Sequence, residues 1–247
     1  MARNRRITKE EESDIQEFLS NKNEKINTIE IKCKTPGQKE LLKSIKENQI
    51  TICSGRAGSG KTYVTSAQSV KFLKEGRFKK IILIKSVVTL KNEEIGYLKG
   101  SLEEKLNPFI GSFIDNFDKL IGKHSFDQMR IDGSIEVVPI AFARGRTLDN
   151  SFIIIDEAQN IDIDNMKSLM TRIGENSKMI ILGDVKQKDI KNKKLSSLEI
   201  IIEKFNNVPD FGTVKLYSEN DVVRNPIIKI IEDRFDEIEE SMNKKTV

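Results

Sequence analysis

Short apolar runs alternate with longer amphipathic segments along most of the chain. Runs rich in Ile, Val and Leu, bounded by polar or glycine-containing stretches, predict buried β-strands, whereas apolar positions spaced three and four apart predict helices. Their alternation is typical of an α/β fold with a mostly parallel sheet and helices on both faces. We expect the strands at about residues 50–54, 80–85, 135–140, 152–156, 178–183 and 212–217.

A glycine-rich segment follows the first of these strands. It fits the pattern G-x-x-x-x-G-K-[ST], and an apolar-periodic helix comes directly after it. Small residues in such a loop let backbone N–H groups turn inward around phosphate oxygens, and the helix N-terminus adds partial positive charge. We therefore expect a nucleoside triphosphate to bind along this loop, which consists of Gly55, Arg56, Ala57, Gly58, Ser59, Gly60, Lys61 and Thr62.

An acidic pair, Asp156 and Glu157, ends the apolar run at 152–155. Such a pair at a strand end is ordinary by itself, but beside a phosphate-binding loop it indicates hydrolysis. Lys61 is then expected to reach the β- and γ-phosphates, and Thr62 to place its hydroxyl on Mg²⁺. Asp156 would hold the metal ion through its hydration shell, which leaves Glu157 to orient the attacking water.

Composition indicates one domain without a membrane segment. The 247 residues can bury a sizeable core but leave no room for a second large domain. No apolar run approaches the roughly 18 residues of a membrane span, and the start lacks a signal-peptide pattern, so we expect a cytoplasmic protein. Cys33 and Cys53 have no disulfide or zinc spacing, and Cys53 is expected to pack as a small hydrophobe. His124, in a polar connector, is the only histidine, which excludes multi-histidine metal sites.

Charge is unevenly distributed although the net charge is only +4. Basic residues cluster at 1–6 and 186–194, and the stretch 232–240 is acidic. Basic clusters usually form solvated surface, but they also capture nucleic-acid phosphates. The three tyrosines are scattered and there is no tryptophan, so a platform for stacking bases is not indicated. Nucleic-acid binding is a hypothesis on these grounds.

Three segments lie outside the simple alternation. Residues 1–34 are polar and lysine-rich and are expected to form a peripheral extension. Residues 92–123 read as mixed helix and loop, and we expect an insertion over the nucleotide-binding face. The last helix carries an apolar stripe that favours core or interface packing, made of Ile228, Ile231, Phe235, Ile238 and Met242.

Several further segments resemble the PhoH-like ATPases in the same order along the chain. They are GYLKG at 96–100, ARGRTL at 143–148, DEAQN at 156–160, TRIG at 171–174, GDVKQ at 183–187 and SENDVVR at 218–224. The resemblance runs from about residue 35 to 235 and implies a RecA-like P-loop NTPase core, related to one ATPase lobe of superfamily-one helicases. It divides the chain into an extension, 1–34, and an ATPase domain, 35–247. Longer family members carry an N-terminal nuclease domain, for which residues 1–34 are too short.

The resemblance also implies roles for single residues. Gln38 is similar to a glutamine that reads an adenine edge, since an amide both donates and accepts. Gln187 resembles a sensor that contacts the γ-phosphate or attacking water and relays hydrolysis to a bound strand. Arg224 is the candidate for stabilising charge on the transferred phosphoryl group. Structural ion pairs and nucleic-acid phosphates remain open alternatives for Arg144, Arg146 and Arg172.

Two positions depart from the family pattern. Lys85-Ser86 stands where Arg-Pro is common, and Asn225 replaces a common histidine. The first departure lies where helicase-like cores often touch a strand, so substrate specificity is not carried over from the family.

Two classes of function follow from these features. The favoured one is Mg²⁺-dependent ATP hydrolysis coupled to RNA or single-stranded DNA, as a translocase or helicase. The alternative is a nucleotide-dependent switch or binding module that acts through a protein partner. A small-molecule kinase fits less well, because the acidic motif and Gln187 resemble strand-coupled ATPases. Because one ATPase lobe leaves the γ-phosphate face open, we expect a homo-oligomer, most simply a hexameric ring, with Arg224 acting in its own subunit or in a neighbour.

Overall fold

The computed structural model describes residues 30–85, 110–187 and 196–223, together with residues 227, 230, 231, 233–235, 237, 238 and 241. Most of the predicted extension, the first part of the predicted insertion and Arg224 lie outside the described residues. No helix within the described ranges has the length and apolar character needed to cross a membrane.

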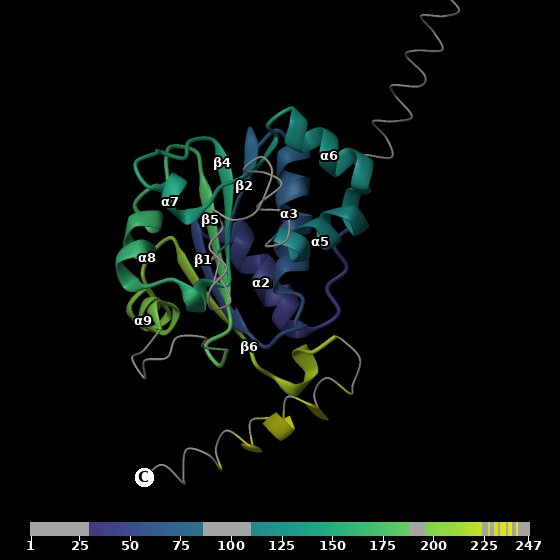
Figure 1. Ribbon diagram of the computed structural model, residues 1–247, viewed down its shortest axis with the longest axis vertical. Helices are drawn as coiled ribbons and strands as arrows, with labels where there is room; N and C mark the ends of the chain where they lie inside the picture. The colour runs from purple at the N-terminus through teal and green to yellow at the C-terminus, as the bar shows by residue number, and fades with distance from the viewer. Residues whose placement is uncertain are drawn as a thin grey trace, which may run out of the picture.

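Within these ranges, six parallel strands form one sheet in the order β3-β2-β4-β5-β1-β6. The sheet runs through the middle of the molecule between two groups of helices (Figure 1). The strands are β1 (Ile50–Gly55), β2 (Lys80–Lys85), β3 (Ile135–Val137), β4 (Ser151–Asp156), β5 (Lys178–Gly183) and β6 (Phe211–Leu216). All six predicted strands are confirmed. The third ends at Val137 rather than at residue 140, because Pro139 has no N–H for the ladder and a short helix starts at Ile140.

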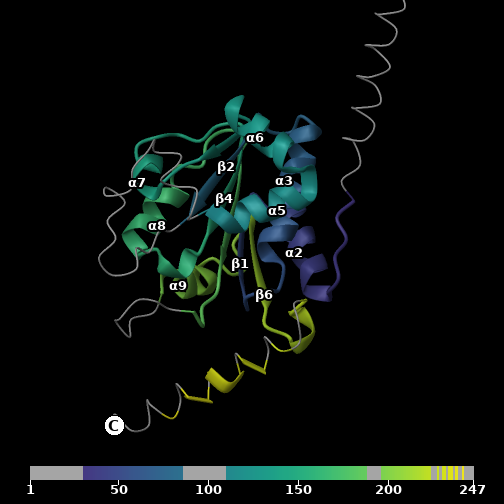
Figure 2. The same cartoon turned by 45° about the vertical axis from the view of Figure 1, so that its right-hand side comes forward.

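Helices cover both faces of the sheet, as Figures 1 and 2 show, which confirms the predicted α/β class with a parallel sheet. One face carries α2 (Pro36–Glu47), α3 (Lys61–Lys74), α5 (Gly111–Ile121) and α6 (Lys123–Ile131). The other carries α7 (Ile140–Ala143), α8 (Ile163–Met170) and α9 (Ser197–Lys204). Two 3₁₀ turns, η3 (Ala158–Asn160) and η4 (Glu219–Asp221), follow β4 and β6.

Local sequence explains where several helices begin. Thr35 caps α2 by accepting a hydrogen bond from Gln38 N. Pro36 suits the first turn because a backbone N–H at that position would have no partner within the helix. Ser196 and Glu199 form a reciprocal capping box at the start of α9. These caps fix where the two helices start relative to the central strands.

The strands are apolar on both faces because each face is covered by helices. In β4, Phe152 and Ile154 pack toward α3, whereas Ile153 and Ile155 pack toward α8 and α9. All four are fully buried, and each such side chain contributes about 1.5–3 kcal/mol to folding. Cys53 is likewise fully buried in the core beside α2 and α3, which confirms the prediction that it packs as a small hydrophobe.

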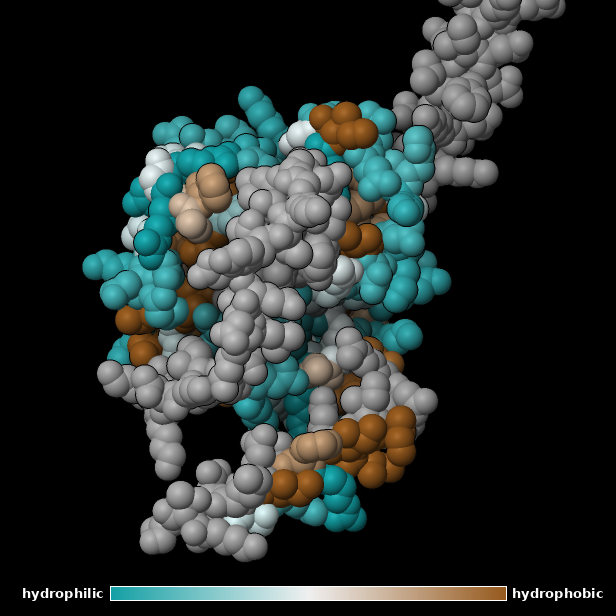
Figure 3. Space-filling view, in the orientation of Figure 1, coloured by the Kyte–Doolittle hydropathy of each residue, from teal (hydrophilic) through white to brown (hydrophobic). Residues whose placement is uncertain are grey.

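One sequence-based expectation needs correction. His124 lies in α6 rather than in a connector, although it is exposed as a polar position should be. For the C-terminal stripe we expect core or interface packing; Ile231, Phe235 and Ile238 are 49%, 61% and 49% exposed, so they do not pack in the core, and interface packing stays a prediction. Figure 3 shows this apolar surface gathered at the C-terminal segment. Ile228 and Met242 of the stripe lie outside the described residues.

Candidate active site

The glycine-rich loop joins β1 to α3 at the carboxyl end of the central strands. Gly58 and Gly60 have φ angles of 78° and 82°, in the left-handed region that favours glycine. A Cβ atom on Gly60 would lie 2.6 Å from Gln38 Nε2, so a side chain there would displace the amide. The loop is thus shaped by its glycines, as its pattern predicts.

One cavity of about 670 Å³, a size typical of ligand sites, brings most of the predicted site residues together. Its wall includes Gln38, Ala57, Gly58, Gly60, Lys61, Thr62, Asp156, Glu157 and Gln187. The described part of the predicted insertion also contributes, because α5 turns Ser112, Asn116 and Lys119 toward the cavity while Phe113 and Phe117 are buried beneath it. The expected position of the insertion over this face holds for α5.

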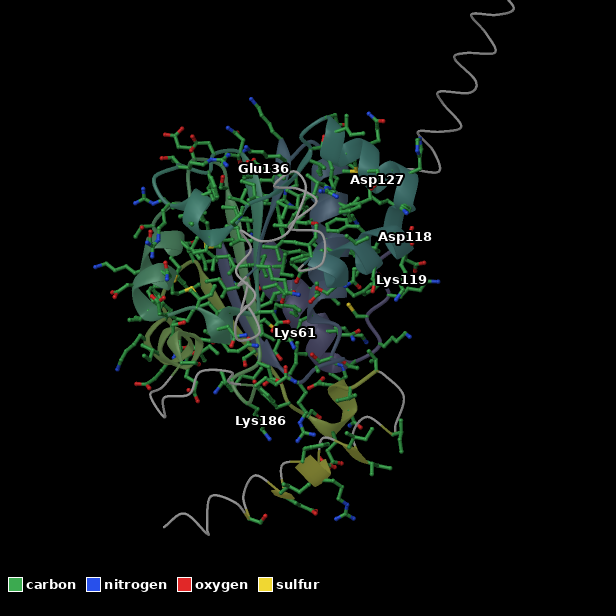
Figure 4. All side chains as sticks on the ribbon, viewed as in Figure 1. Lys61, Asp118, Lys119, Asp127, Glu136 and Lys186 are labelled. Carbon is green, nitrogen blue, oxygen red and sulfur yellow. The ribbon has the colours of Figure 1, made fainter. Side chains whose placement is uncertain are left out.

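Lys61 is the first residue of α3 and lies in the interior of the view in Figure 4. Its Nζ donates to the carbonyl oxygens of Gly55 and Arg56, the latter at 3.0 Å, and lies 3.5 Å from Ser59 Oγ. The Lys61 ammonium is therefore held inside the loop, where it would neutralise negative charge on the phosphates of a bound nucleotide.

Gln38 is buried and braces the loop. Its Oε1 accepts a hydrogen bond of 2.7 Å from Lys34 N, and its Nε2 donates one of 2.9 Å to Ser59 O. A primary amide has two donor hydrogens and two acceptor lone pairs, so one of each remains for a ligand once its partners among the described residues are counted. Gln38 lines the cavity as expected, and its reading of adenine stays a prediction.

Asp156 is the last residue of β4 and is buried, with 5% of its surface exposed. Burial raises the pKa of its carboxyl to about 6, and the neighbouring Glu157 carboxylate adds to the rise, while Lys85 opposes it. A divalent cation would offset this cost of burying a carboxylate. Glu157 follows with φ of 55°, an uncommon conformation for a side-chain-bearing residue that is often found at functional sites.

Gln159 belongs to the acidic motif, but the sequence alone assigns it no role. Its Nε2 donates a hydrogen bond of 2.7 Å to Glu157 Oε2, and its Oε1 accepts one of 3.0 Å from Asp184 N. The amide therefore connects the carboxylate after β4 to the end of β5. The available signal was the amide two positions after the carboxylate, but only the fold shows that β5 supplies its second partner.

The loop after β5 carries Gln187 and is held against the P-loop strand. Tyr217 OH donates to Asp184 Oδ1 at 3.0 Å and accepts from Val185 N at 3.0 Å, and it also hydrogen-bonds Ser54 Oγ. Burial raises the pKa of Tyr217, which keeps the phenol neutral. Gln187 N donates to Asp184 O at 3.2 Å, and its exposed side chain reaches the cavity wall.

The arginine alternatives are partly separated by the structure. Arg146 makes a bidentate pair with Glu136 at 2.7 and 3.2 Å, and this hydrogen bonding lowers the pKa of Glu136. Arg146 thus has a structural ion pair. Arg144 donates to Asn165 on the exposed surface of α8, which leaves both of its alternatives open.

The oxygen donors fit Mg²⁺ held jointly with a nucleotide. Thr62 and Asp156 line the same cavity. In the described part of the chain, no group of three or more His, Cys, Asp and Glu side chains could hold a metal ion. Mg²⁺ commonly takes one or two protein ligands and completes its shell with phosphate oxygens and water. The residues present suit that mode of binding.

Known proteins are similar in sequence to most of this chain. A PhoH-like protein of Bacillus subtilis (strain 168) is 39% identical over 203 residues, which are 82% of this chain and 63% of that protein. One of Synechocystis sp. (strain ATCC 27184 / PCC 6803 / Kazusa) is 34% identical over 209 residues, 85% of this chain and 63% of that protein. The chain thus spans less than two thirds of the length of these relatives.

A solved structure, the large terminase from a thermophilic bacteriophage, overlaps partially, with a TM-score of 0.44 and 12% identity over 81% of this chain and 50% of that chain. The sequence profile described as PhoH-like protein matches residues 30–236. Since that match covers well over half of the sequence and includes all six strands, the chain belongs to the PhoH-like protein family.

Proposed function

We propose that this chain is a Mg²⁺-dependent ATPase whose hydrolysis is coupled to RNA or single-stranded DNA. One observation carries the proposal: a phosphate-binding loop, a buried carboxylate and a second carboxylate in a left-handed conformation line one cavity. Family membership supports the ATPase part. A cytoplasmic location suits this chemistry because ATP and Mg²⁺ are both available there.

The protein's own groups divide the work of hydrolysis. The loop N–H groups and Lys61 bind the β- and γ-phosphates, and Thr62 with Asp156 holds the metal ion. Mg²⁺, when bound, neutralises charge that develops on the phosphate oxygens. Glu157 orients the attacking water, and Gln159 keeps that carboxylate in place through its 2.7 Å hydrogen bond.

Adenine is proposed as the base because of Gln38. The side chain is buried and contacts the phosphate-binding loop through Ser59 O, and among the described residues one amide hydrogen and one oxygen lone pair have no hydrogen-bond partner. A base bound at Gln38 would therefore be linked to the phosphate-binding loop through the hydrogen bond from Gln38 to Ser59 O.

Nucleic-acid coupling is proposed from the charge around the site. Lys32, Lys34 and Lys119 line the same cavity as the P-loop, and Lys186 begins the basic stretch beside Gln187. Binding through such groups is electrostatic and depends little on base sequence. Gln187 lines the cavity and is the second residue of the basic stretch 186–194, as a relay between hydrolysis and a bound strand would need to be; residues 188–194 of that stretch lie outside the described residues.

A specific observation favours the second candidate, a nucleotide-dependent switch that acts on a protein. Arg56 of the P-loop forms an ion pair of 3.5 Å with Asp233 of the C-terminal segment, which exposes Ile231, Phe235 and Ile238. An exposed apolar stripe is typical of protein contacts. A partner that covered this stripe would lie next to the phosphate-binding loop.

We also propose that copies of the chain assemble into a closed ring, most simply a hexamer. A single ATPase lobe leaves the γ-phosphate side open, and a head-to-tail neighbour would close it. The exposed C-terminal stripe and Arg224 are the proposed contributions to that contact.

ATPase rates measured with and without RNA or single-stranded DNA test the proposal. We expect stimulation by single strands, loss of nucleotide binding in Lys61→Ala, and retained binding with little turnover in Glu157→Gln. Glu203→Gln, which removes an exposed charge on α9, serves as the matched control and should retain activity. Near-normal turnover in Glu157→Gln would remove that residue from its role. The protein switch would be favoured if the protein hydrolyses ATP, nucleic acid does not stimulate the rate, and the protein binds no nucleic acid at low salt.

A further inference from the structure

The last residue of β2 lies beside the acidic pair. Lys85 is in register with Asp156 across the β2–β4 pairing, so the two strands deliver a cation and a carboxylate to the same edge of the sheet. The Lys85 side chain is only 17% exposed, although lysine usually extends into water. The ammonium lies beside the acidic pair because Lys85 ends β2 next to the end of β4.

The Lys85 ammonium has two partners from two different elements. Its Nζ donates a hydrogen bond of 3.1 Å to Ser112 Oγ in the first turn of α5, and it lies 3.9 Å from Glu157 Oε1. The other oxygen of the same carboxylate, Oε2, is held by Gln159. Glu157 is thus restrained from both sides, by a cation and by an amide.

Ser112 is itself a fixed point. It is adjacent in sequence to Phe113, which is fully buried together with Phe117 against α3 and the sheet. Because packed aromatic side chains anchor α5, the Ser112 hydroxyl holds the long lysine side chain in one direction.

We propose that Lys85 is a positioning residue for Glu157, which it holds against α5 through Ser112 so that the carboxylate faces the attacking water. This inference deepens the proposed ATPase function and rests on it. A competing role, direct contact between Lys85 and a nucleotide phosphate, differs in its consequences, because it would change nucleotide affinity.

The test compares four single variants by kcat, KM and the dissociation constant of a fluorescent ATP analogue. Lys85→Met keeps the chain length and removes the charge, and it should lower kcat by about ten-fold or more with analogue affinity within about two-fold of wild type. Lys85→Arg should restore most of kcat. Ser112→Ala should lower kcat by about two- to three-fold. Lys80→Met is the matched control, since Lys80 lies at the other end of β2 and pairs with Glu136.

A double variant asks whether Lys85 acts through Glu157. In single-turnover assays, Lys85→Met added to Glu157→Gln should change the residual rate by less than about two-fold, because residues that act as a unit are not additive. Melting temperatures of the ligand-free proteins show whether each variant folds. If Lys85→Met weakens analogue binding by more than about ten-fold, Lys85 contacts the phosphates and the positioning role is wrong.

The positioning role of Lys85 and the ATPase activity can be contradicted separately. The positioning role is wrong if Lys85→Met leaves kcat unchanged, or if it lowers kcat and Lys85→Arg does not restore it. The ATPase function is unaffected by either result as long as the wild-type protein hydrolyses ATP and Glu157→Gln binds ATP with little turnover. Absence of ATP hydrolysis in the wild-type protein would overturn the proposed function itself, and the positioning role with it.

Discussion

Gln159 holds Glu157 by a hydrogen bond of 2.7 Å, from Nε2 of the amide to Oε2 of the carboxylate. The amide packs closely against the end of β5, since a side chain at Gly183 would already lie 2.6 Å from its Oε1. The end of β5 therefore determines where the carboxylate after β4 can lie.

Gln159→Leu should lower kcat by roughly ten- to hundred-fold, since it removes a hydrogen bond to a charged group and leaves Asp184 N without its partner. Steady-state ATPase assays would measure this, with ATP affinity expected to change little. Gln159→Glu should also be impaired, because a second carboxylate repels Glu157. Wild-type kcat in both variants would show that the hydrogen bond does not matter for turnover.

Gln38→Ala separates the two roles of that glutamine. If Gln38 reads adenine, the variant loses the preference for ATP over GTP and CTP, whereas a residue that only braces Ser59 O weakens all three alike. We expect both effects, with ATP affinity falling by about ten-fold or more. Titration calorimetry with the three nucleotides measures them. Equal weakening for all three would contradict adenine recognition.

Arg146→Ala should reduce stability and leave affinity for single strands unchanged. The Arg146–Glu136 pair is partly exposed, so solvent screening limits the expected loss in unfolding free energy to about 1 kcal/mol. Urea denaturation measures the loss, and filter binding at several salt concentrations measures affinity. Arg144→Ala, at a more exposed site, is the comparison. A smaller salt dependence of binding in Arg146→Ala would assign that arginine to nucleic-acid phosphates instead.

The two cysteines should react at different rates with a disulfide reagent. Thiolate is the reactive form, and burial raises the pKa of Cys53 to about 12, whereas Cys33 is only partly buried. At pH 8 the native protein should release about one equivalent of reporter quickly and a second only after denaturation. Rapid reaction of both thiols in the native protein would contradict the burial of β1.

Mixing variants tests the proposed ring. Arg224→Ala and Glu157→Gln proteins should each be nearly inactive, but mixed rings regain part of the activity if Arg224 serves a neighbour's site, since some interfaces then combine two intact residues. Activity should vary with mixing ratio. Light scattering that detects only monomers in a fully active preparation would exclude the ring.

Much of this fold could be predicted because β2, β4 and β5 each contain a run of four apolar residues and polar or glycine-containing segments separate the strands. The P-loop residues and the acidic pair were predictable for the same reason, since their chemistry depends on local order. Lys85, Ser112 and Gln159 were not, because their partners lie on other strands or helices and become neighbours only through the strand order. The C-terminal stripe was ambiguous, as periodicity alone does not distinguish a core face from an exposed one.

The position of β1 has a consequence for how the protein is made. β1 comes first in sequence but lies between β5 and β6, so that Ile50 pairs with both Met179 and Phe211. Contacts between residues that are far apart in sequence form slowly. A nascent chain also exposes both edges of β1 until β5 and β6 have left the ribosome. The phosphate-binding loop is thus translated early, yet the strand that supports it gains its last neighbour only when almost the whole domain has been synthesised.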